Sequence, residues 1–191
     1  GGYGYDRRIV DQLRALGRAV EIVELEGTFP FCCDTAKASA GAALTAIPDG
    51  AVAVIDGLAL PAFEHALSPH RGRVQLVALI HHPLALETGL SDGQRTHLAA
   101  VEGALIGQVN GVVVTSPATA DLLPGQELDA GAISVVLPGT DPAPRAKGSA
   151  GPVVQLLCVG TLIARKGYAV LIDALAQCTY LPWRLSCLGA L

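Results

Sequence analysis

Two adjacent histidines offer the clearest candidate chemistry in the sequence. His81 and His82 stand at the end of the apolar run VQLVALIH, residues 74–81. An imidazole can donate a hydrogen bond to a phosphate or a sugar hydroxyl, and it can move a proton near neutral pH. Because neighbouring strand residues point to opposite faces, we expect one side chain to point inward and the other toward a cleft. The alternative is that one is a core histidine with satisfied hydrogen bonds. No third ligand lies at a recognisable spacing, so we expect no metal.

A pair of cations is the second candidate. Arg165 and Lys166 lie in GTLIARKG, residues 160–167, between an apolar run and a helical pattern. The N-terminal end of a helix carries partial positive charge, so further cations there are unfavourable unless an anion shares the site. The sequence leaves two interpretations open, a pair pointing into water or an anion site.

The opening GGYGYD is the third candidate. Gly1, Gly2 and Gly4 precede a helical pattern. Glycines let a backbone approach a phosphate closely, and a helix start supplies free N–H groups. The spacing is not GxGxxG, so an ordinary tight turn is the alternative.

Two polar residues end other apolar runs. Asp56 ends AVAVID, and structural and functional roles are equally open for it. Ser116 ends GVVVTS, and we expect it mainly to cap a helix that begins at Pro117. No GxSxG elbow, Walker loop or HExxH motif occurs, which disfavours hydrolase, P-loop and zinc-protease functions.

The elements that must position these residues alternate along the chain. Most apolar runs are continuous, as is typical of strands buried on both faces of a parallel sheet. The expected strands are residues 19–25, 51–56, 74–81, 111–116, 132–137, 152–160 and 183–189, and the expected helices are 6–16, 34–46, 92–108 and 166–177. This alternation predicts an α/β fold, a Rossmann-like doubly wound parallel sheet followed by the beginning of a second Rossmann-like domain.

A segment rich in proline and glycine divides the chain. Residues 138–151, PGTDPAPRAKGSAG, cannot sustain a helix or a central strand and are expected to be a linker. The expected domains are 1–137 and 152–191. Because the chain has no methionine and opens abruptly on a helical pattern, we interpret it as incomplete, with the first strand of the first domain missing.

Composition excludes several classes of function. The 191 residues are 51% hydrophobic and 16% charged with a net charge of −4, which argues against a nucleic-acid binder and a polybasic membrane patch. No apolar run reaches the roughly 18–20 residues that span a bilayer. Five cysteines without CxxC spacing indicate free thiols in a reducing cytosol.

The order of these motifs resembles a known family. A glycine-rich opening, a histidine at a strand end, TSPATA, a VVLPGTDP hinge and VGTLIARKGYAVLIDAL are together similar to the GT-B glycosyltransferases of family 4, across essentially the whole chain. The resemblance implies two Rossmann-like domains that face each other across a cleft. The first holds mainly the acceptor, and the second holds the nucleotide-sugar donor.

The resemblance also implies roles in binding the donor diphosphate. Lys166 matches the family's diphosphate-binding lysine, and Arg165 lies beside it. The family commonly has an arginine directly after the strand-ending glycine, where this chain has Thr161. Gly1 and Gly2 match the loop that brings backbone amides to the donor phosphate.

His81 matches the family's histidine near the sugar and its phosphate, which would make it the catalytic residue. His82, Asp56 and Ser116 would lie on the acceptor side of the cleft. Negative charge builds on the departing nucleoside diphosphate, so nearby cations would stabilise it. The family implies retention of configuration, no cofactor and no metal. Its downstream glutamate pair would lie beyond Leu191, and we expect the chain alone to be inactive.

The implied partners are a nucleotide-sugar and an acceptor such as a sugar, a lipid-linked glycan or a small molecule. A cytoplasmic location is expected, with peripheral contact at the inner membrane face left open. One alternative is a Rossmann oxidoreductase using NAD(P), with Glu24 or Glu26 binding the ribose, although the glycine spacing fails. The other alternative is a non-catalytic GT-B-like binding or assembly protein.

Overall fold

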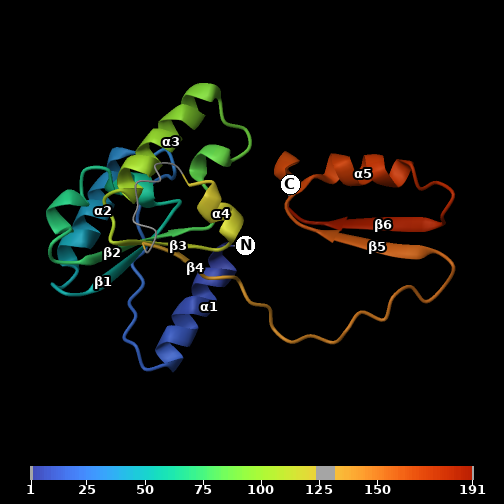
Figure 1. Cartoon of the computed structure of the whole chain (residues 1–191), viewed down its shortest axis with the longest axis horizontal. Helices are drawn as coiled ribbons and strands as arrows, with labels where there is room; N and C mark the ends of the chain where they lie inside the picture. Colours follow the sequence, from blue (N-terminus) through green and yellow to red (C-terminus); the bar gives the residue numbers. More distant parts are fainter. Residues whose placement is uncertain (1, 124–131, 191) are drawn as a thin grey trace. The chain divides into compact units, whose positions relative to one another are not determined.

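A computed structural model describes residues 2–123 and 132–190 of the chain. The chain divides into two compact units, Gly1–Gly139 and Thr140–Leu191, each of which is described by itself (Figure 1). The boundary falls inside the expected linker. The residues that follow it, 140–149, are exposed and form neither helix nor strand.

A parallel sheet organises the first unit. Its strands are β1 (Val52–Asp56), β2 (Gln75–Ile80), β3 (Gly111–Val114) and β4 (Ile133–Val135), and their order in the sheet is β1-β2-β3-β4. All three pairings are parallel. The prediction of an α/β fold with a parallel sheet is therefore confirmed for this unit. Since all four strands run the same way, their carboxyl ends meet at one edge.

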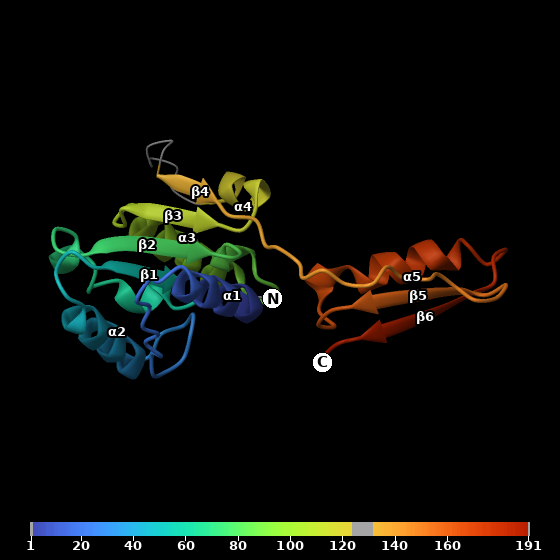
Figure 2. The same ribbon diagram turned by 90° about the horizontal axis from the view of Figure 1, so that it is seen from below.

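Helices and 3₁₀ turns connect the strands. The α-helices are α1 (Gly2–Ala15), α2 (Asp34–Ala46), α3 (Asp92–Ile106) and α4 (Pro117–Asp121), and the 3₁₀ turns are η1 (Leu60–Phe63), η2 (Ser68–His70) and η3 (Leu84–Leu86). Two views at right angles place α1 and α3 on opposite faces of the sheet (Figures 1 and 2). Ser91 begins α3 with a capping box, in which its side chain and that of Gln94 each bind the other's backbone N–H.

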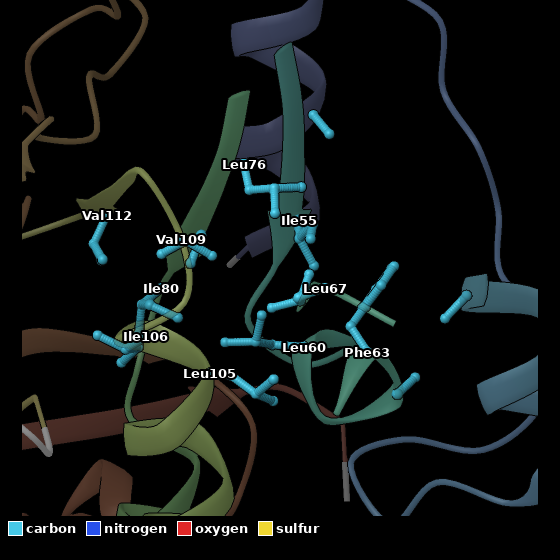
Figure 3. Packing of buried hydrophobic residues seen from close by; sticks show 14 of the residues in the cluster. Ile55, Leu60, Phe63, Leu67, Leu76, Ile80, Leu105, Ile106, Val109 and Val112 are labelled. Atoms are coloured by element: carbon cyan, nitrogen blue, oxygen red, sulfur yellow. The ribbon is translucent and has the colours of Figure 1, made fainter. Parts of the chain in front are cut away.

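The core lies on the face of the sheet that α3 and η1 cover (Figure 3). Alternate strand residues, among them Ile55 and Leu76, pack there against η1 and α3 side chains such as Leu60 and Ile106. Burying a side chain of this size stabilises the fold by about 1.5–3 kcal/mol. The other face is less covered, and β1 exposes 64% of Val52 and 58% of Val54 there. The expectation that most strands are buried on both faces is wrong for β1, since this face of the strand stays open to solvent and no residue of α1, the helix on that side of the sheet, is fully buried.

One arginine joins the end of α2 to the start of β2. The Arg73 guanidinium donates hydrogen bonds to the carbonyls of Leu44 and Ile47 and to the Asp49 carboxylate. Its Nε atom also donates to His70 Nδ1. The last carbonyls of a helix lack partners within the helix, so Arg73 satisfies the C-terminal end of α2.

The predicted strand at residues 19–25 is wrong. Among the described residues, no strand pairs with this segment, and Ile22 and Val23 are more than half exposed. Side chains satisfy backbone groups at both of its ends instead. Arg14 donates to the carbonyl of Val20 at 2.8 Å, and the N–H of Glu26 donates to the Ser39 hydroxyl at 3.1 Å.

Several predicted boundaries also move. The predicted helix 6–16 begins earlier, at Gly2, and 92–108 ends earlier, where Gly107 caps α3. The predicted strand 111–116 stops at Val114, because Ser116 is already the N-cap of α4. The helix expected at 34–46 has the expected bounds.

The second unit is a β-α-β arrangement. Its strands β5 (Val154–Val159) and β6 (Trp183–Leu188) are parallel. Between them lie the 3₁₀ turn η4 (Ala164–Lys166) and helix α5 (Tyr168–Ala176). The helix expected from residue 166 begins two residues later, because Gly167 adopts a left-handed φ of 69° between the turn and the helix. None of the described residues 140–190 is fully buried.

Candidate functional site

His81 lies at the centre of a cluster at the carboxyl edge of the four-stranded sheet. Its Nε2 atom is 2.8 Å from Oδ1 of Asp6 in α1. The same atom is 3.9 Å from Oδ2 of Asp56, the last residue of β1. All three side chains are partly buried, with 24% of His81, 29% of Asp6 and 42% of Asp56 exposed. The imidazole therefore lies between two carboxylates.

The fold explains why these residues meet. Asp56 pairs in register with Leu79, and His81 follows two residues later, directly after the neighbouring strand β2. The start of α1 lies against the same imidazole, since a Cβ placed on Gly2 would be 3.2 Å from His81 Cδ2. One helical turn after Gly2, the side chain of Asp6 reaches the ring. Sequence analysis predicted Gly2, Asp56 and His81 as site residues, and the structure brings them together. It missed Asp6.

Tyr5 fixes the first turn of α1 against the sheet. Its ring meets the His81 imidazole edge to face, with centroids 5.3 Å apart and planes at 87°. Its hydroxyl donates to the carbonyl of Val136 at 3.0 Å. Burial, and then the Asp6 charge, raise the pKa of Tyr5, so the hydroxyl stays protonated and donating.

The two carboxylates are in different environments. Burial raises the pKa of Asp6; the neighbouring His81 lowers it by charge and by hydrogen bonding, and Asp56 raises it again. Asp56 is more exposed, and its Oδ1 accepts the N–H of Leu58 at 2.7 Å. That hydrogen bond fixes the Asp56 side chain with its other oxygen, Oδ2, on the side of His81.

A pocket of about 180 Å³ lies beside the cluster. Its lining residues are Asp56, Gly57, Leu58, His81, His82, Leu84 and Glu87. The backbone at Gly57 packs closely against β2, because a Cβ there would lie 2.9 Å from Cδ1 of Ile80 and 3.2 Å from the carbonyl oxygen of Leu79, so a side chain at this position would need its neighbours to shift. The pocket is small but holds both a carboxylate and imidazoles, the groups that bind sugar hydroxyls or cations.

His82 contributes a second imidazole. Its Nε2 atom is buried and has no hydrogen-bond partner among the described residues. One histidine was expected to point inward and one toward a cleft. The buried Nε2 atom of His82 fits the inward role, although both residues line the pocket.

A buried glutamate holds the backbone of Leu84, one of the residues that line the pocket. Glu102 in α3 is fully buried, and its two carboxylate oxygens accept the N–H of Leu84 at 3.2 and 3.3 Å. Burial raises the pKa of Glu102 to about 7, against the opposing effect of that hydrogen bond. Sequence analysis missed this residue. The sequence does contain an indication of its burial, because Glu102 directly follows Val101 and lies on the helix face that carries Leu98 and Leu105.

Ser116 has the capping role that the sequence favoured. Its hydroxyl oxygen accepts the N–H of Thr119 at 3.0 Å, and Pro117 is the first residue of α4. Ser116 does not line the pocket. Its neighbour Thr115 is closer to the cluster, since its hydroxyl donates to the backbone carbonyl of His81 at 3.3 Å.

The predicted phosphate-binding residues of the second unit lie on one connection. Thr161, Arg165 and Lys166 are exposed and follow β5. Lys166 ends the turn η4 rather than starting a helix, and its aliphatic stem lies 3.9 Å from the position of a Cβ on Gly160. Tyr168 closes the connection by donating its hydroxyl to the carbonyl of Gly160 at 2.6 Å. Gly1 lies outside the described residues.

All five cysteines are free thiols. Cys33, at the N-cap of α2, is exposed, and backbone hydrogen bonds from Ala36 and then Thr28, with the Thr28 side chain, lower its pKa to about 7. Its neighbour Cys32 is partly buried, and that burial raises its pKa.

Comparison with known proteins assigns no family. Neither a scan against models of protein families nor a search of curated proteins finds a match to this sequence. Within the described residues, no helix combines the length and apolar character needed to cross a bilayer.

Proposed function

We propose that the chain serves in glycosyl transfer from a nucleotide-sugar donor to an acceptor. In this proposal the first unit is the acceptor-side domain, a doubly wound Rossmann-like sheet. The second unit is the opening of a donor-binding domain. The observation that carries the proposal is the carboxylate-held imidazole of His81 beside a pocket at the carboxyl edge of a parallel sheet. Open α/β sheets bind their ligands at that edge.

The chemistry fits the residues of each unit. Breaking a sugar–phosphate bond places negative charge on the departing nucleoside diphosphate. In the first unit, His81 can donate a hydrogen bond to a sugar hydroxyl or phosphate oxygen if its ring releases Asp6. In the second unit, Lys166 and Arg165 supply cationic groups for a diphosphate, one as a point charge and one as a planar fork.

A non-catalytic binding or assembly role is the second candidate. The observation that favours it is the apolar surface of the second unit, where Leu157, Val159 and Leu188 are 66%, 72% and 57% exposed. Two strands and one helix cannot cover both faces of their sheet. An oxidoreductase function has less support, since residues 19–25, whose strand end would carry the ribose-binding acid, form no strand.

Calorimetric titration of the chain with a panel of nucleoside diphosphates tests the proposed function. We expect one of them to bind, and Lys166→Ala to weaken that binding by roughly 10- to 150-fold, because a phosphate loses a charge-assisted partner worth about 1.5–3 kcal/mol. Lys147→Ala is the matched control, since Lys147 is also an exposed lysine of the second unit but lies in the extended segment 140–149. If both variants bind as the unmodified chain does, Lys166 has no role in diphosphate binding. If no nucleoside diphosphate binds, the non-catalytic candidate is favoured.

A further inference from the structure

The cluster around His81 is rich in metal-ligating atoms. Asp6, Asp56 and His81 each offer one ligand atom, and these three atoms lie within 4.8 Å of one another. They come from three separate elements, namely α1, the end of β1 and the residue after β2. Such convergence of two carboxylate oxygens and one imidazole nitrogen needs a tertiary fold, so no sequence spacing could indicate it. We propose that Asp6, Asp56 and His81 bind a divalent cation of the Mn²⁺ or Zn²⁺ class.

The distances suit an ion after small side-chain movements. An ion that binds oxygen and nitrogen at about 2.0–2.2 Å holds its ligand atoms roughly 3–3.5 Å apart. The Nε2 atom of His81 is now 2.8 Å from Asp6 and 3.9 Å from Asp56. To bind an ion, the distance to Asp6 must lengthen and the distance to Asp56 must shorten, each by less than about 1 Å. The backbones need not move, because both carboxylates sit on side chains that are partly exposed.

Charge also favours a cation. Two carboxylates around one imidazole carry a net negative charge whether the ring is protonated or neutral. Partial burial strengthens the repulsion between the two carboxylates. A divalent ion would bind to both carboxylates and to the neutral ring, replacing the single hydrogen bond between His81 and Asp6.

The neighbouring pocket adds a further reason to expect a ligand here. It is lined by Asp56 and His81 themselves and by Glu87. His82 lines it as well, and its buried Nε2 atom has no hydrogen-bond partner among the described residues. A buried polar atom without a partner costs free energy unless a water, an ion or a ligand satisfies it. Three protein ligands leave coordination positions open for water or a substrate oxygen.

The ligand set defines the class of ion. Carboxylate oxygens suit Mn²⁺, imidazole suits Zn²⁺, and a mixed set of two oxygens and one nitrogen binds either. Mn²⁺ is the better probe because the five free thiols of the chain would compete for the softer Zn²⁺. This inference does not rest on the proposed function, since the three groups would bind a cation whatever the substrate.

The test is a titration of the chain with Mn²⁺ alone, in which the paramagnetic resonance signal of the free ion reports binding. We expect saturable binding of one ion per chain, weakened tenfold or more in Asp6→Asn and in Asp56→Asn. These amides keep the shape of the side chain, and circular dichroism checks that each variant is folded. Asp11→Asn is the matched control, because Asp11 is an exposed carboxylate on the same helix, and we expect it to bind like the unmodified chain.

Nuclear magnetic resonance locates the ion independently of the variants. Bound Mn²⁺ should broaden the imidazole signals of His81 and His82 before those of the three remaining histidines, His65, His70 and His97. Absence of saturable binding would overturn the proposal. Binding that Asp6→Asn and Asp56→Asn leave unchanged, or broadening that spares His81, would overturn it equally.

Discussion

Glu102 should make the first unit less stable as the pH rises. In the folded chain its pKa is about 7, against an ordinary value of 4.5. Between these values the folded state binds more protons than the unfolded state, so the free energy of unfolding falls with rising pH. The contribution is fully present below pH 4.5 and is lost as the pH rises through 7. The difference in pKa corresponds to roughly 3 kcal/mol.

The perturbation that isolates this effect is Glu102→Gln. The amide oxygen of glutamine can still accept the N–H of Leu84, but the side chain no longer ionises. Any fixed cost of burying the amide is the same at every pH, so it does not affect how the free energy of unfolding changes with pH. Relative to the unmodified chain, the variant should therefore gain up to about 3 kcal/mol in stability between pH 4.5 and pH 8.

Urea unfolding followed by far-ultraviolet circular dichroism, at steps across this range of pH, measures the effect. Most of the helix belongs to the first unit, whereas the single tryptophan, Trp183, belongs to the second. Tryptophan fluorescence is thus an internal control, and it should respond to pH identically in both proteins. If the circular dichroism midpoints of the two proteins change in parallel with pH, Glu102 does not titrate as argued.

Two further predictions concern the rest of the first unit. Arg73→Ala should destabilise this unit by about 1.5–3 kcal/mol, because partly buried carbonyls at the end of α2 lose a charged donor. Arg71 is a neighbouring exposed arginine, and Arg71→Ala should change the urea midpoint little. Equal effects of the two substitutions would contradict the role of Arg73. Iodoacetamide should alkylate Cys33 with a rate that rises through about pH 7, while Cys32 lags because burial raises its pKa. Peptide mass spectrometry reads both sites, and faster labelling of Cys32 would refute the assignment.

The sequence predicted where helices and strands lie better than it predicted which segments pair with one another in a sheet. An alanine-rich composition located α2 with its observed bounds, and continuous apolar runs located the four strands of the parallel sheet. The prediction failed at residues 19–25, where β-branched and other apolar side chains predominate but, among the described residues, the backbone pairs with no neighbouring strand. Propensity describes a segment alone, whereas a strand requires an edge to pair with.

Part of the candidate site could also be predicted from the sequence. Residues at strand ends, such as Asp56 and His81, can be found because parallel strands bring their carboxyl ends to one edge. Asp6 and Glu102 could not be found in this way, since each acts from a helix whose rotation against the sheet is set by packing. The roles inferred for Lys166 and Arg165 stay predictions.

Binding of a nucleotide-sugar at His81 tests the central claim most directly. The measurement is a titration of the chain with nucleotide-sugars, with a chelator present to exclude metal effects, while the five imidazole signals are followed by nuclear magnetic resonance. The proposed function predicts that one donor shifts His81 saturably and leaves His65 and His97, which are exposed and do not line the pocket, unchanged. A panel of donors that leaves His81 unmoved, or moves all five histidines equally, would contradict it.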